Sequence, residues 1–149
     1  MKLYLHILII LNFLFSNLIF SQEETTKFYI TELRGDISLE MEINNLESNK
    51  GPIYIRILDE NENPVIVGTS TVINYSAEIS FDSISPGKYA IQFFHDENEN
   101  KKMDFNLIGI PKEKFGSSNN VKPVLGPPKF EKMLINLNEN KKIIIIPVN

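Results

Sequence analysis

Apolar and polar residues alternate along much of the chain, which is the pattern of half-buried β-strands. Residues 36–46 (DISLEMEINNL) place Ile37, Leu39, Met41 and Ile43 on one face and polar or acidic residues on the other. The same alternation returns in three further stretches, PIYIRIL (52–58), AEISFDSI (77–84) and SPGKYAIQFFH (85–95). No segment sustains the 3.6-residue period of a long helix. The pattern therefore predicts an all-β protein.

Two more strands are expected near the C-terminus, in KFEKMLINL (129–137) and KKIIIIPV (141–148). The four isoleucines 143–146 contain too much β-branching to favour a helix, and they predict a strand buried on both faces. A further strand at 28–33, or one at 65–75, brings the total to about seven. Seven short strands separated by turn signals predict a single antiparallel β-sandwich of the immunoglobulin-like kind.

The first 21 residues have the layout of a secretory signal peptide, with Lys2 ahead of an apolar run that ends at the small residue Ser21. Polar residues interrupt the run at positions 12, 16 and 17, and no basic cluster follows it, so a membrane-spanning helix is disfavoured. We expect residues 1–21 to be a cleaved signal peptide and residues 22–149 to form one exported domain, periplasmic or extracellular, with no membrane span after cleavage.

Composition changes this picture in two ways. The chain has no cysteine, so neither a disulfide nor a lipid on an N-terminal cysteine is available. Removing residues 1–21 takes away Lys2 and no acid, which leaves 14 basic residues against 19 acidic ones and a net charge of −5. This charge makes nucleic acid and anionic membrane surfaces poor partners.

A long irregular loop, residues 96–128, is predicted between the strand that ends near His95 and the strand that starts near Lys129. A loop of this length inside a compact domain is usually functional or disordered. Its Gly-Ile-Pro and Gly-Pro-Pro segments favour a defined path, and we expect Phe105 and Phe115 to anchor it to the sandwich.

Oxygen-bearing side chains occupy alternate positions at the start of this loop. With Asp96 as position one, Asn98, Asn100 and Asp104 fall at three, five and nine. Such spacing lets several oxygens converge on one hard cation, and calcium prefers oxygen ligands. The predicted Ca2+ site consists of these four side chains, the backbone carbonyl of Lys102 at position seven, and the carboxylate of Glu113.

Two parts of the usual calcium loop are missing from the pattern. Position six is Lys101 where a glycine is usual, and position twelve is Leu107 where a bidentate glutamate is usual, so Glu113 is the expected substitute.

The asparagines alone are weak evidence for a metal site, because similar Asn- and Glu-rich sequences occur at other predicted turns of this chain. DENEN occurs at 59–63 and again at 96–100, and NENKK occurs at 98–102 and at 138–142. Only the DENEN at 96–100 is followed by a second acid at position nine. Two interpretations therefore stay open, a calcium site and an Asx-rich turn that satisfies its own hydrogen bonds.

Catalytic chemistry is the less favoured interpretation of this loop. His95 is the only histidine after residue 21, and without cysteine it is a poor basis for a zinc site, so we expect it to hydrogen-bond a loop backbone. Ser117 and Ser118 lack a glycine-flanked elbow. Asp96 and Asp104, on one solvated loop, lack the apolar pocket that would separate the pKa values of two catalytic carboxylates.

The runs SPGKYAIQFFHDENENKKMDFNLIGIPKEKFGSSNN (85–120) and GPPKFEKMLINL (126–137) resemble DUF2141, a bacterial family of exported proteins of unknown function. The match covers the family's hallmark residues, Tyr89, Ala90, His95, Asp96, Asn98, Asn100, Asp104, Gly109, Ile110, Pro111, Glu113 and Gly116. Members of the family typically carry glycine where this chain has Glu99, Lys101 and Lys114. The resemblance implies export and a prealbumin-like β-sandwich, and it implies no activity.

The expected function is that of an exported, monomeric, non-enzymatic module whose calcium loop presents a surface to a glycan or protein at the bacterial envelope. Two alternatives stay open. One is a metal-free carbohydrate- or peptide-binding module, and the other is an envelope hydrolase that uses Asp104, Glu113 or His95.

Overall fold

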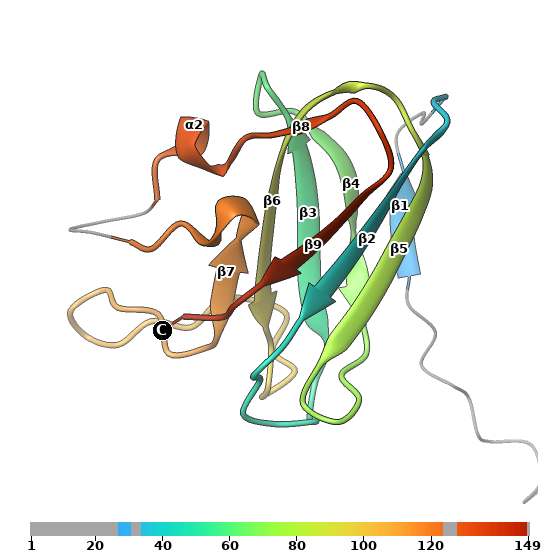
Figure 1. The fold of residues 1–149 in the computed structure, drawn as a ribbon. Helices are drawn as coiled ribbons and strands as arrows, with labels where there is room; N and C mark the ends of the chain where they lie inside the picture. Colours follow the sequence, from blue (N-terminus) through green and yellow to red (C-terminus); the bar gives the residue numbers. More distant parts are fainter. Residues whose placement is uncertain (1–26, 31–33, 124–127, 149) are drawn as a thin grey trace, which may run out of the picture.

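The computed structural model describes residues 27–30, 34–123 and 128–148, whose strands form two sheets (Figure 1). The larger sheet has the order β1 (Lys27–Ile30), β4 (Pro64–Ser70), β3 (Ile53–Asp59), β6 (Gly87–His95) and β7 (Phe115–Ser117), with β8 (Ile135–Leu137) also paired to β6. The smaller sheet has the order β5 (Ala77–Ile84), β2 (Ile37–Ile43) and β9 (Lys141–Ile145). The predicted signal peptide, residues 1–21, lies outside the described residues.

The core lies between the two sheets and is built from alternate strand positions. In β2 the predicted inward face is confirmed, because Ile37, Leu39, Met41 and Ile43 are all buried. β3, β5 and β6 contribute their own inward residues to the same cluster. Full burial of one such aliphatic side chain is worth about 1.5–3 kcal/mol, so the alternation itself accounts for the packing of the sandwich.

The all-β sandwich is confirmed, and the described residues contain more strands than the expected seven. Both alternative strands exist, as β1 and β4, and β7 is an additional short strand inside the predicted irregular loop. One strand pair departs from the antiparallel expectation: β9 lies parallel to β2, with Met41 opposite Ile143.

The prediction that residues 143–146 are buried on both faces is wrong. Ile145 is buried, whereas Ile144 and Ile146 are about half exposed. β9 is the edge strand of the smaller sheet, so one of its faces packs on the core and the other faces solvent. The segment 129–137 is also only partly a strand, because it begins with one helical turn, α2 (Phe130–Met133), which buries Met133 before β8 starts.

The second half of the predicted loop is tied to the sandwich. β7 pairs with β6, with Phe115 opposite Phe94, and leads into the 3-10 turn η1 (Ser118–Asn120). The buried Ser118 hydroxyl donates to the Met133 carbonyl and accepts the Ile91 N–H. The part between β6 and β7 remains an extended loop. Among the described residues, no helix is long and apolar enough to cross a bilayer.

Candidate metal-binding loop

The loop begins where β6 ends, at a junction that is closed on two sides. His95 and Asp96 have no exposed surface. The His95 N–H donates to the Lys114 carbonyl at 2.8 Å, and the Asp96 N–H donates to the Pro52 carbonyl at 3.0 Å. Gly51 passes so close that a Cβ there would lie 1.9 Å from the Asp96 carbonyl oxygen. The first residue of the predicted site is therefore held rigidly.

The Asp96 carboxylate organises the turn that follows it. Its Oδ1 accepts the Asn100 N–H at 3.0 Å, and its Oδ2 accepts the Lys101 N–H at 2.7 Å. These bonds satisfy a fully buried carboxylate from the backbone of its own turn. Each oxygen retains a further lone pair, so either oxygen could also coordinate a cation.

Asp104 receives the two asparagine side chains. Its Oδ2 accepts the Asn98 amide hydrogen at 2.7 Å and the Asn100 amide hydrogen at 2.9 Å. The amide oxygens point the other way, because Asn98 Oδ1 accepts the Asn100 N–H and Asn100 Oδ1 accepts the Lys102 N–H. In this arrangement the amides offer hydrogens to Asp104, as an Asx-rich turn that satisfies itself would. Lys102 takes part through its N–H, whereas the prediction used its carbonyl.

Glu113 is the buried carboxylate that the turn does not satisfy. Its side chain is 6% exposed, Oε2 accepts the Asp104 N–H at 3.2 Å, and Oε1 has no hydrogen-bond partner in the described parts of the chain. Burial raises the pKa of Glu113 above its ordinary value of 4.5, and the negative charges of Asp96, Asp104 and Glu97 raise it further. The hydrogen bond from the Asp104 N–H lowers the pKa of Glu113, but the net shift is upward.

The predicted side chains are thus brought together, although not in a finished ligand shell. Asp96, Asn98, Asn100, Asp104 and Glu113 form one hydrogen-bonded cluster with the backbone of Lys102. Within the residues that the structure describes, no group of three or more His, Cys, Asp or Glu side chains is arranged to hold a metal ion. Calcium also takes amide and backbone oxygens, and those would have to turn toward it.

The other DENEN, at 59–63, shows what the same letters do without a second acid. Asp59 Oδ1 accepts the N–H groups of Asn61 and Asn63, and its Oδ2 accepts the Asn63 amide hydrogen. This turn between β3 and β4 closes on itself. In the DENEN at 96–100, the Asn98 and Asn100 amides instead donate to the Asp104 carboxylate, and the Asp104 N–H donates to Glu113.

The comparisons with known proteins agree with the residue pattern. Residues 41–145 match the family described as "Uncharacterized protein conserved in bacteria (DUF2141)", which covers most of the chain. The chain belongs to DUF2141. No curated protein and no solved structure matches it significantly. The family description names no activity, so the function of this DUF2141 chain has to be argued from its site.

Two residues of the turn that follows Asp96 have left-handed backbone. Glu99 has a φ of 59° and Lys101 has a φ of 66°. A side chain in this region costs about 1–2 kcal/mol, which explains why glycine suits both positions.

His95 confirms the expectation of a structural histidine. Its Nε2 lies 2.8 Å from the Lys50 carbonyl, so Nε2 carries the proton and donates it. Its Nδ1 lies 3.6 Å from Glu97 Oε1 and makes no hydrogen bond with the described residues. The ring therefore ties the end of β6 to the segment before β3.

The expected role of Phe105 as an anchor is wrong, because the residue is more than half exposed. It belongs to an apolar tip that we define as Phe105, Leu107, Ile108 and Ile110, all exposed, on the pale orange loop that projects beside β7 (Figure 1). Asn106 shapes this tip, since its Oδ1 accepts the N–H groups of Ile108 and Ile110. Phe115, in contrast, is partly buried in β7. Sequence reasoning missed the tip, although LIGI is an unusual apolar run within a polar loop.

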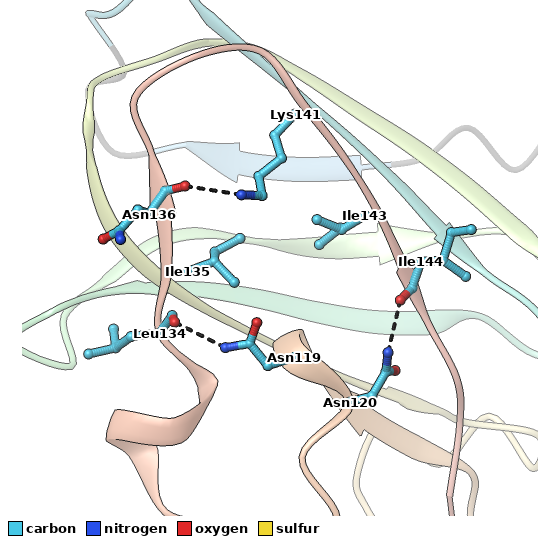
Figure 2. Close-up of a pocket in the computed structure, with 8 residues that line it drawn as sticks. All are labelled: Asn119, Asn120, Leu134, Ile135, Asn136, Lys141, Ile143 and Ile144. Carbon is cyan, nitrogen blue, oxygen red and sulfur yellow. Dashed lines mark hydrogen bonds between the residues drawn. The ribbon is translucent and has the colours of Figure 1, made fainter.

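Sequence reasoning also missed a pocket of about 450 Å³ on another side of the molecule. It lies between η1, the segment before and within β8, and β9 (Figure 2). Its lining comes from three separate stretches, as residues 119–120, residues 134–136, and residues 141, 143 and 144. None of the predicted metal ligands takes part in it.

Proposed function

We propose that this protein is an exported, non-enzymatic β-sandwich module whose loop 96–113 binds one calcium ion and presents the apolar tip to a partner in the bacterial envelope. The observation that carries the proposal is the Glu113 carboxylate, which is buried beside other acids and has an oxygen without a partner. A buried charge of this kind is normally paired or bound to a cation. A divalent cation would supply the missing positive charge.

The ligands would be the three carboxylates of Asp96, Asp104 and Glu113, with oxygens from Asn98, Asn100 and the Lys102 carbonyl. Binding requires both asparagine amides to leave Asp104, which breaks two exposed hydrogen bonds. Exposed bonds of this kind contribute about 0.5–1.5 kcal/mol each. Calcium sites of extracellular modules have dissociation constants of about 0.1–1 mM, so the modest cost is consistent with a site in that range.

A calcium ion in this site would hold the apolar tip in place. The Lys112 N–H donates to the Asp104 carbonyl, and the Asp104 N–H donates to Glu113, so the base of the tip is made of ligand residues. Exposed groups of apolar side chains commonly mark interaction sites. A cation at the base would fix the direction in which the tip projects.

A second candidate is the metal-free binding module, and the amide orientations favour it. Both asparagines already satisfy Asp104 with hydrogens, and Asp96 is satisfied by backbone N–H groups. In that case the same tip would be presented by a turn that needs no cation.

Thermal unfolding with and without calcium separates the two candidates. With free calcium tenfold above its dissociation constant, the protein should gain about 1.4 kcal/mol in stability and its Tm should rise by a few degrees. Asp104→Asn should abolish this rise. Asp59→Asn is the matched control, because Asp59 occupies the first position of the other DENEN, and its Tm should rise as in the wild type. If the wild type shows no rise at about 10 mM calcium, the metal-free module is correct. If Asp104→Asn keeps the rise, calcium binds outside the proposed ligand set and the proposed site is wrong.

A further inference from the structure

One side of the sandwich, where the two sheets meet, is closed at one end and open at the other. At the closed end the chain beyond β9 pairs directly with β7, since Val148 and Phe115 exchange backbone hydrogen bonds of 2.7 and 3.0 Å. At Ile144 and Ile146, earlier along the chain, the two segments no longer share a direct backbone hydrogen bond. There the Asn120 side chain bridges them, with Nδ2 donating to the Ile144 carbonyl and Oδ1 accepting the Ile146 N–H.

Beyond Asn120 this side opens into the pocket shown in Figure 2. On the opposite wall, the Asn119 side chain bridges η1 to the segment before β8, because its Nδ2 donates to the carbonyls of Lys132 and Leu134. Both asparagines have left-handed backbone, with φ values of 60° and 51°, which asparagine tolerates better than most residues. Two successive side chains therefore hold two opposing walls apart at a fixed spacing.

The β9 wall of the pocket is a free strand edge. β9 pairs with β2 along one edge, and the smaller sheet places no strand on the other. Backbone groups of alternate residues point to the same edge of a strand. Because the Ile144 carbonyl faces Asn120, the Ile144 N–H and the peptide groups of Lys142 face away from β2 as well. Within the described part of the chain, those groups make no hydrogen bond to a residue outside the smaller sheet.

Asn120 shows what this edge accepts. Its carboxamide donates to the Ile144 carbonyl and accepts the Ile146 N–H, two residues later along the chain. In a parallel sheet, one residue of a neighbouring strand bonds this same pair of groups through its own N–H and carbonyl. The Lys142 carbonyl and the Ile144 N–H form the same pair one step back along β9. A peptide group placed there would continue the series that Val148 and Asn120 begin.

We propose that the pocket binds an extended peptide segment of another protein, which adds to the free edge of β9. Main-chain hydrogen bonds to Lys142 and Ile144 would give affinity, as in other cases of strand addition. The side chains around them specify the peptide. Ile135 is buried and Ile143 is partly buried, so an inward-pointing residue of the peptide is apolar.

Charge defines the neighbouring position of the peptide. The Lys141 ammonium lines the pocket, and its hydrogen bond among the described residues is a long one, 3.4 Å, to the Asn136 carbonyl (Figure 2). An acidic side chain of the peptide would pair with it at the rim. The ligand class is therefore an extended peptide in which apolar and acidic residues alternate. This site does not depend on the calcium loop.

The test uses a blocked pentapeptide of alternating valine and aspartate, titrated into the ¹⁵N-labelled protein in EDTA up to about 2 mM, a range that detects millimolar affinity. The amide signals of Lys142 and Ile144 should shift. The same peptide with N-methylated peptide groups should not bind, because it lacks the N–H donors. The Lys141→Met variant should bind the aspartate peptide several-fold more weakly.

Ile144→Pro is the decisive variant, because it deletes the outward N–H without touching the ladder to β2. Proline is tolerated at an edge whose N–H faces solvent, so the fold should persist. Ile144→Ala, which keeps the N–H, is the matched control. We expect Ile144→Pro to weaken peptide binding about tenfold and Ile144→Ala to change it less than about twofold.

Three outcomes would overturn the proposal. The first is the absence of shifts at Lys142 and Ile144 throughout the titration. The second is equal binding by Ile144→Pro and Ile144→Ala. The third is a concentration-dependent dimer in sedimentation equilibrium that Ile144→Pro disrupts, because the edge then pairs with a second copy of the chain.

Discussion

Glu113→Gln changes the charge of the candidate site and almost nothing of its shape. The glutamine oxygen can accept the Asp104 N–H as Oε2 does, and its amide group takes the place of the unpartnered Oε1 beside the acids. A buried polar group without a partner costs about 1–3 kcal/mol. Without calcium the variant should therefore be more stable than the wild type by about 1–2 kcal/mol at pH 7.

The pH dependence of this difference follows from the raised pKa of Glu113. Because the folded protein holds that pKa above its ordinary value of 4.5, the wild type is stabilised by protonation of Glu113 below about pH 4.5. That stability is lost as the pH rises through the raised pKa. Glutamine does not titrate, so the stability difference between variant and wild type should be smallest near pH 4 and grow toward pH 7.

Calcium should reverse the order of the two proteins. The wild type binds the ion and gains stability, whereas Glu113→Gln loses a carboxylate ligand and its calcium response. The assay is urea and thermal unfolding of both proteins at pH 4 and pH 7, in EDTA and in calcium. Glu99→Gln, at an exposed acid of the same loop, is the control and should behave like the wild type.

Two results would refute this reasoning. If Glu113→Gln is less stable than the wild type in EDTA at pH 7, the carboxylate is stabilised by an interaction that the charges around it do not account for. If the variant keeps the full calcium response, the ion binds without Glu113.

The remaining predictions concern the frame of the loop and the N-terminus. Gly51→Ala should cost more than about 2 kcal/mol in urea unfolding, because φ is +72° and the new Cβ would meet the Asp96 carbonyl, whereas Gly109→Ala, with φ of +79° and open space, should cost about 1 kcal/mol; equal costs would contradict the close approach. Lys101→Gly should raise stability by up to about 1 kcal/mol by relieving left-handed backbone, and an unchanged or lower Tm would count against that strain. Mass spectrometry of the protein recovered from its bacterial host should find Gln22 as its first residue if residues 1–21 are a cleaved signal peptide; retention of residues 1–21 would contradict cleavage after Ser21.

The alternation of apolar and polar residues correctly predicted which face of a strand is buried, because that property depends on neighbouring residues in the sequence. In β2, and in β5 as far as Phe81, each apolar residue faces the core at period two, as the sequence alone indicates. At the end of β5 a register shift buries Ile84 three positions after Phe81. The isoleucines of β9 misled because burial of the second face depends on a neighbouring strand, and no residue within the run reports that β9 lies at an edge. The same reasoning applies to Phe105, whose exposure follows from the turn that Asn106 closes rather than from its own hydrophobicity.

The candidate site could be predicted in its membership and not in its geometry. A short loop necessarily brings Asp96 and Asp104 close together, so spacing was sufficient to group the acids and amides. The orientation of the Asn98 and Asn100 amides is decided by backbone N–H groups that a sequence does not place. The pocket beside β9 could not be predicted from the sequence, because its walls come from stretches that lie apart along the chain and meet only when the two sheets pack.

The parallel pairing of β2 with β9 has a consequence for the order in which the protein can form. Leu39 lies opposite Lys141, so the smaller sheet joins residues separated by most of the chain. Contacts of such long range are closed late, since the entropy of the intervening loop is lost before they are made. The smaller sheet cannot be completed until residues 141–145 have been synthesised. Until then β2 lacks one neighbour, and the edge of β2 that β9 covers in the finished fold stays unpaired.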